Sequence, residues 1–303
     1  MKTDLVVKDN ALINASYNLE VTEQRLILLA IIGARETGQG VDSDSKLFIK
    51  AIEYTNQFST DISTSYEVLK SGAENLFNRY FSYKYQDDNK GEIVVKSRWV
   101  SQIGYIADKG ELFITFAPAV VPFITRLEEQ FTSYQLKQVA QLKSKYAIRL
   151  YEILIAWREV GKCTIKLDDL RFRLGVEDNE YVRMSDFKIR VLDTAIKQIN
   201  EYTDISVQYD QQKSGRVITG FIFKFKIKQE PKKIIGSEKI PTFTDKQRHL
   251  FASKLSELPE MGKYSQGTES YQQFAFRISK MLLDKTKLIE LLPNLKKVGY
   301  DPK

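Results

Sequence analysis

The feature that most constrains the fold of this chain is an order of elements that occurs twice along its first 228 residues. In the first half, a hairpin over 81–99 follows three earlier segments: a helix over 22–36, a strand and short helix over 47–59, and a longer helix ending near Tyr80. The apolar residues change there from helical spacing to alternation, which indicates that helix gives way to strand. The buried face of the longer helix is expected to consist of Val68, Leu69, Leu76, Phe77 and Tyr80.

The second half repeats this order with little residue identity. A helix over 144–160 is followed by the strand CTIKL, a short helix over 168–174, a longer helix over 185–202 and a hairpin over 205–227. Helix N-caps are expected at Ser144, Asp168 and Ser185, since these residue types cap well. Helix, short strand, short helix, longer helix and hairpin is the order of a winged helix, a helix-turn-helix with a β-hairpin attached.

The pattern predicts an α+β protein of tandem winged-helix domains with a small helical C-terminal appendage. We place the first winged helix at 1–130, the second at 131–230, a linker with two prolines at 231–242, and the helical region at 243–303. Within that region, 244–258 and 271–292 are expected to be helical. An unrelated α+β protein whose helices and hairpins happen to recur is the alternative.

The positive charge of the chain belongs to its second half. Residues 1–131 have a net charge of −4, residues 132–228 of +6 and residues 229–303 of +5. A basic domain suggests a polyanionic partner, usually nucleic acid. A basic surface that is merely solvated is the alternative.

The sequence offers little for catalysis. One cysteine, Cys163, and one histidine, His249, exclude a disulfide framework and most zinc or iron sites. No glycine-rich phosphate-binding loop is present. We therefore predict no enzyme activity, metal or cofactor. No apolar run reaches 18 residues and the N-terminal residues MKTDLVVKDN lack the apolar core of a signal peptide, so we expect a cytoplasmic protein without a membrane span.

The helix over 185–202 has the two faces of a DNA recognition helix. Its apolar face is expected to contain Phe187, Val191, Leu192, Ala195, Ile196 and Ile199. The opposite face carries Arg190, Thr194 and Lys197, and Arg183 and Lys188 flank the start of the helix. Arginine bonds guanine in two places and lysine holds phosphate, so such a face suits the major groove. Lys213 and Arg216, near the tip of the following hairpin, would contact the backbone or the minor groove.

The first half offers a comparable, weaker set. Its hairpin, interpreted as the first wing, carries Lys84, Lys90, Lys96 and Arg98, and its longer helix offers Lys70 and Arg79 on the polar side. We predict these residues as further DNA contacts. Each alone is equally well explained as a solvated charge.

The sequence resembles a known family over about residues 5–228. The runs KYAIRLYEIL, IKLDDLRFRLGV, FKIRVLDTAIKQIN and KSGRVITGFIFKF resemble the second winged helix of iteron-type plasmid replication initiators. The runs LEVTEQRLILLAI and SYEVLKSGAENLFNRY resemble the first. The tail at 243–303 lies outside the shared part.

The resemblance implies a protein that binds repeated double-stranded DNA sites at a plasmid origin and helps to open it without being an enzyme. It implies monomers on the repeats, dimers that repress the protein's own promoter, and the host initiator and helicase as partners. The acidic first domain puts strong phosphate contact by that domain in doubt. A winged-helix transcriptional regulator without a replication role, and a DNA-cleaving enzyme, are the competing functions.

Overall fold

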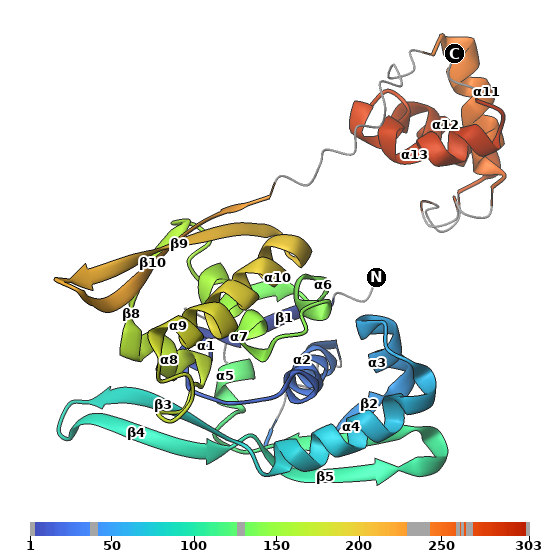
Figure 1. The fold of residues 1–303 in the computed structure, drawn as a ribbon. Helices are drawn as coiled ribbons and strands as arrows, with labels where there is room; N and C mark the ends of the chain where they lie inside the picture. Colours follow the sequence, from blue (N-terminus) through green and yellow to red (C-terminus); the bar gives the residue numbers. More distant parts are fainter. Residues whose placement is uncertain are drawn as a thin grey trace. The chain divides into compact units, whose positions relative to one another are not determined.

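The chain forms two compact units, Met1–Gln229 and Glu230–Lys303 (Figure 1). The computed structural model describes residues 4–36, 42–125, 131–228, 243–258, 261, 264 and 269–300. The expected linker at 231–242 lies outside the described residues. The division of the first unit at residue 130 stays a prediction.

The first winged helix follows the predicted order. Its elements are α2 (Val21–Glu36), β2 (Leu47–Lys50), α3 (Ala51–Phe58), α4 (Ile62–Phe77), β5 (Val100–Ile106) and β6 (Glu111–Phe116). The three strands form an antiparallel sheet in the order β2-β6-β5. Strand β5, which was not predicted from the sequence, completes this sheet.

The second winged helix has the same topology. Its elements are α7 (Lys145–Ile155), β8 (Lys162–Lys166), α8 (Leu167–Leu174), the helix Met184–Tyr202, β9 (Ile205–Ser214) and β10 (Val217–Ile227). The strand order is β8-β10-β9, so in both halves the short strand pairs with the last strand of a hairpin. This shared topology confirms the tandem winged-helix prediction.

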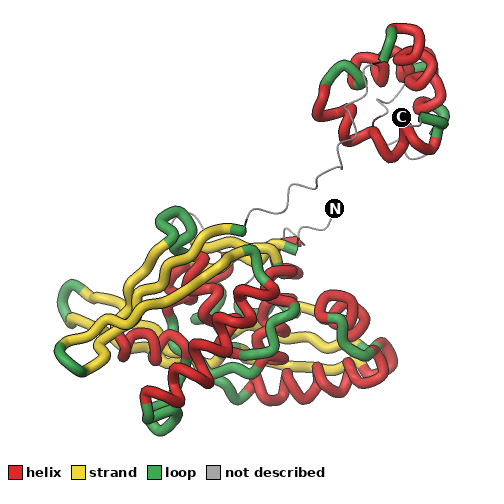
Figure 2. Tube along the Cα trace, turned by 45° about the horizontal axis from the view of Figure 1, so that its top comes forward, coloured by secondary structure: helices red, strands yellow, loops and turns green. Residues whose placement is uncertain are grey.

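The hairpin that was interpreted as the first wing is a separate element. Among the described residues, strands β3 (Tyr80–Asp87) and β4 (Gly91–Arg98) pair only with each other, apart from one bridge between Ser16 and Ser82. The wing's place in the first sheet belongs to β5 and β6, joined through Ala107–Gly110. The interpretation was wrong because an alternation of apolar and polar residues identifies a strand but does not identify the strand with which it pairs. The β3–β4 and β9–β10 hairpins project at the same end of the unit (Figures 1 and 2).

The expected buried face of α4 is only partly correct. Leu69 and Leu76 are fully buried, whereas Val68, Phe77 and Tyr80 are 40%, 37% and 43% exposed. The buried stripe of the helix runs instead through Ser65, Leu69, Gly72, Ala73 and Leu76. Small residues are needed there because α4 packs closely on α2. A Cβ atom on Gly72 would lie 2.6 Å from the Thr22 side chain.

Several helix starts also differ from expectation. Ser144 precedes α7 without a side-chain hydrogen bond to it. Helix α8 begins at Leu167, so Asp168 lies in its first turn, where a carboxylate complements the helix dipole. The recognition helix begins at Met184 with Arg183 at the N-cap position, which places Ser185 inside it.

A buried charge cluster ties the N-terminal strand to the second winged helix. Strand β1 (Leu5–Asp9) pairs with β7 (Phe131–Gln135), which packs against α7. The Glu152 carboxylate of α7 accepts hydrogen bonds from Lys8 Nζ at 2.6 Å, Arg149 Nη1 at 2.7 Å and Tyr134 OH at 2.6 Å. Burial alone would raise the pKa of Glu152, but the two neighbouring cations and these bonds outweigh it and lower the pKa to about 2. Glu152 is therefore an ionised carboxylate inside the core.

The C-terminal unit has a hydrophobic core of its own. It contains α11 (Asp245–Ser256), α12 (Tyr271–Met281) and α13 (Lys285–Lys297). Thr244 and Ser270 begin α11 and α12 with reciprocal capping boxes. The single helix expected over 271–292 is interrupted after Met281, which lets Leu282 and Leu288 enter the same core.

Candidate nucleic-acid interface

The helix Met184–Tyr202 is continuous and strongly amphipathic. Five of its six expected apolar contacts are buried against α7 and the β8-β10-β9 sheet: Phe187, Val191, Leu192, Ala195 and Ile199. Three hydrogen bonds fix the helix beside the wing. Asn200 pairs with the backbone of Val207 through both its amide atoms, and Tyr209 OH donates to Asp193 at 2.8 Å. The helix and the hairpin are thus held as one rigid surface.

The cations of this surface have no partner within the described part of the chain. Arg183, Arg190 and Lys197 are exposed on the helix, Lys188 is half-buried, and Lys213 and Arg216 are exposed at the hairpin tip. Gly215 at that tip has φ +59°, a left-handed conformation that favours glycine. These six side chains form a basic surface over two adjacent elements, as a recognition helix and its wing require.

A π-helical turn, Phe187–Asp193, lies inside the recognition helix. The turn places Thr194 beneath the carbonyl group of Ile189, to which the Thr194 hydroxyl donates at 2.9 Å. That hydroxyl therefore already donates its proton within the helix, so towards a DNA base it can act only as a hydrogen-bond acceptor. Such turns are rare and often mark functional sites. No signal in the sequence indicated the π turn.

The candidate residues of the first half are engaged differently. Arg79 binds the buried Glu23 carboxylate with Nε at 3.0 Å and Nη2 at 3.1 Å. Arg98 Nη1 donates to the Phe77 carbonyl at 2.6 Å. Lys84 pairs with Glu92 at 3.2 Å. Lys70 and Lys96 lie over the rings of Tyr105 and Tyr80, respectively. Of the six, Lys90 alone has an exposed amine with no partner among the described residues.

Two grooves run where the β3–β4 hairpin approaches the second winged helix. One, of about 300 Å³, brings Arg79 and Lys96 beside Asn18 and Gly175. Gly175 ends α8 with φ +66°, and a Cβ there would collide with the backbone of Tyr17. The other groove, of about 500 Å³, is lined by Lys84 on one side and by residues of α8 on the other. The Lys84 ammonium lies 5.6 Å from the centre of the Phe172 ring. The hairpin therefore joins the two winged helices.

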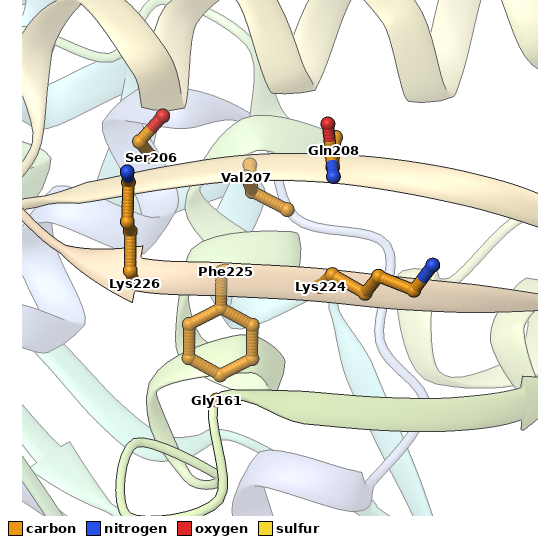
Figure 3. A pocket seen from close by; sticks show the side chains of 7 residues that line it. All are labelled: Gly161, Ser206, Val207, Gln208, Lys224, Phe225 and Lys226. Carbon is orange, nitrogen blue, oxygen red and sulfur yellow. The ribbon is translucent and has the colours of Figure 1, made fainter.

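A third depression, of about 410 Å³, lies on the β8-β10-β9 sheet (Figure 3). Gly161, Val207 and Phe225 line it together with the polar side chains of Ser206, Gln208, Lys224 and Lys226. Lys224 is paired there with Asp210 at 2.8 Å. None of these residues belongs to the recognition helix or the hairpin tip, so the depression lies apart from the basic surface.

The described residues show no arrangement suited to metal chemistry. Among them, no three His, Cys, Asp or Glu side chains gather into a group that could hold a metal ion. Burial raises the pKa of the Cys163 thiol to about 11, which is the behaviour of an unreactive packed cysteine. None of the helices described combines the length and apolar composition needed to cross a membrane.

The fold defines a tandem winged-helix protein whose second winged helix presents a basic surface. The family model "Initiator Replication protein, WH1" matches residues 5–155, and "Initiator Rep protein, WH2" matches residues 166–225. The chain therefore belongs to the family of initiator replication proteins with two winged helices.

The chain is similar to three known proteins. An Escherichia coli protein described as an uncharacterized 27.6 kDa protein is 26% identical over 234 residues, which is 75% of this chain and 95% of that protein. The crystal structure of the Pi initiator protein in complex with iteron DNA covers 76% of this chain and 100% of its own, with a TM-score of 0.63 and 21% identity. The WH1 domain of MSBI1.176, a replication protein isolated from a multiple sclerosis patient, is 57% identical, covers 42% of this chain and 95% of that domain, and has a TM-score of 0.35.

Proposed function

We propose that this protein initiates plasmid replication by binding repeated sites, or iterons, in double-stranded DNA at the origin. The observation that carries the proposal is the set of six unpartnered cations on the described recognition helix and wing. A protein that leaves so many cations unpaired on one rigid surface is suited to a polyanion. Membership of the initiator family supports the choice of an origin as the target.

The two winged helices would not contribute equally to this binding. Five of the six candidate residues of the first half already contact a carboxylate, a carbonyl oxygen or an aromatic ring. We therefore assign base recognition to the second winged helix. Lys90, at the tip of the β3–β4 hairpin, is the first-half residue best placed for an added phosphate contact.

Strand opening would draw on binding energy and DNA deformation, without catalysis by the protein itself. We further propose that the host initiator and helicase are recruited to the opened origin. The same surface, presented twice by a dimer, would bind an inverted repeat and repress the protein's own promoter.

Footprinting on the DNA that flanks the gene tests the proposal. Several evenly phased protected repeats are the expected result, together with replication of an origin-containing plasmid only when the protein is supplied. A single protected inverted repeat, without such replication, would indicate a transcriptional regulator. Strand cleavage in a magnesium-containing nicking assay would contradict the absence of catalysis.

A further inference from the structure

The basic face of the recognition helix carries one unexpected side chain. Ile189 is 61% exposed and lies between Lys188 and Arg190. Within Met184–Tyr202, it is the one aliphatic side chain that is more than half exposed. Burying an isoleucine side chain is favourable, and a β-branched residue is not a strong helix former. Neither the fold nor helix propensity therefore explains isoleucine at this position.

The position of Ile189 is held by the π turn. Thr194 Oγ1 donates to the Ile189 carbonyl oxygen at 2.9 Å, five residues back along the chain. The β-branched side chain itself has few rotamers, so it projects in a defined direction. Ile189 lies in the second turn of the helix, and the N-terminal residues of a recognition helix are those that meet base edges.

We propose that Ile189 contacts the C5-methyl group of a thymine in the major groove and makes that base pair a determinant of site specificity. This inference rests on the proposed DNA-binding function of the helix. The thymine methyl group is the apolar group that a base pair presents in the major groove. Lys188 and Arg190 supply charge on both sides of Ile189, so the methyl contact adds specificity to a surface whose affinity is electrostatic.

Deoxyuridine substitution tests the contact directly, because deoxyuridine keeps the hydrogen bonds of thymidine and lacks its methyl group. The probe is the duplex that the full-length protein protects in footprinting, synthesised with each thymine replaced in turn. We expect the wild-type protein to lose roughly three- to fivefold in affinity at one or two positions, the worth of one buried methyl group. Ile189→Ala should bind the thymine and uracil duplexes equally at those positions, whereas Ile189→Val should keep part of the difference.

Val160→Ala is the matched control. Val160 is 67% exposed and lies outside the recognition helix and the wing. This variant should show the wild-type profile, and circular dichroism should show all three variants folded. The inference is overturned if uracil has no effect at any position, or if Ile189→Ala retains the wild-type profile. Either result leaves the proposed function standing. A protein that protects no DNA segment would overturn the proposed function and the inference together.

Discussion

Replacing Glu152 by glutamine tests whether the buried charge cluster holds the first unit together. Glutamine keeps the shape of the side chain but removes its charge. Lys8 and Arg149, which are 3% and 1% exposed, would then lack their counter-charge. Removing one partner of a buried ion pair costs about 3–5 kcal/mol. This is a large part of the roughly 5–15 kcal/mol that stabilises a typical domain.

The titration of Glu152 leads to a similar magnitude. Its pKa falls from 4.5 in the unfolded chain to about 2 in the folded one, because Lys8 and Arg149 outweigh the effect of burial. At about 1.4 kcal/mol per pKa unit, this difference is worth about 3 kcal/mol. Since the folded pKa is the lower one, the stabilisation is complete above pH 4.5 and is lost as the pH falls towards 2. The difference in stability between wild type and Glu152→Gln should therefore shrink over that range.

Urea unfolding followed by tryptophan fluorescence provides the assay. Both tryptophans, Trp99 and Trp157, lie in the first unit, so the signal reports that unit in the full-length protein. Glu92→Gln is the matched control, since Glu92 and its partner Lys84 are both about half exposed. We expect it to change the unfolding free energy by at most about 1 kcal/mol. If Glu152→Gln destabilises the unit no more than Glu92→Gln does at pH 7, the cluster does not stabilise the unit as argued.

Three further predictions concern DNA binding and domain structure. Arg190→Ala should cost roughly 1–3 kcal/mol of binding free energy on the cognate site and much less on scrambled DNA. Lys197→Ala should weaken binding to both DNAs equally. If paired affinity titrations show that Arg190→Ala loses equal affinity for both DNAs, Arg190 is a phosphate contact. Neutralising Lys213 and Arg216 together should reduce the slope of log affinity against log salt concentration by about one to two units. An unchanged slope would place the wing off the DNA. A fragment ending near residue 230 should fold and bind, because the C-terminal unit has a separate hydrophobic core; circular dichroism and a gel shift would check it, and an unfolded fragment would show that the tail belongs to the core.

The sequence by itself determined the features that depend on local periodicity. The helices of the second half, and the apolar and basic faces of the recognition helix, follow from residues spaced three and four apart. Arg190 and Lys197 are exposed, and Phe187 and Val191 buried, as that spacing predicts. Cap residue types were a weaker guide: Asp168 lies in the first turn of α8, and Ser185 lies inside its helix.

Only the tertiary structure decided which distant segments meet. The sequence of the β3–β4 hairpin is typical of a wing, but the strands that pair into the first winged-helix sheet with β2 are β5 and β6. Arg79 is bound by Glu23, 56 residues away, and Glu152 by Lys8, 144 residues away. Such partners cannot be read from local patterns, because neither the pairing of strands nor the enclosure of a charge is encoded near the residue concerned. Whether a cation remains free for DNA is settled by the same long-range packing.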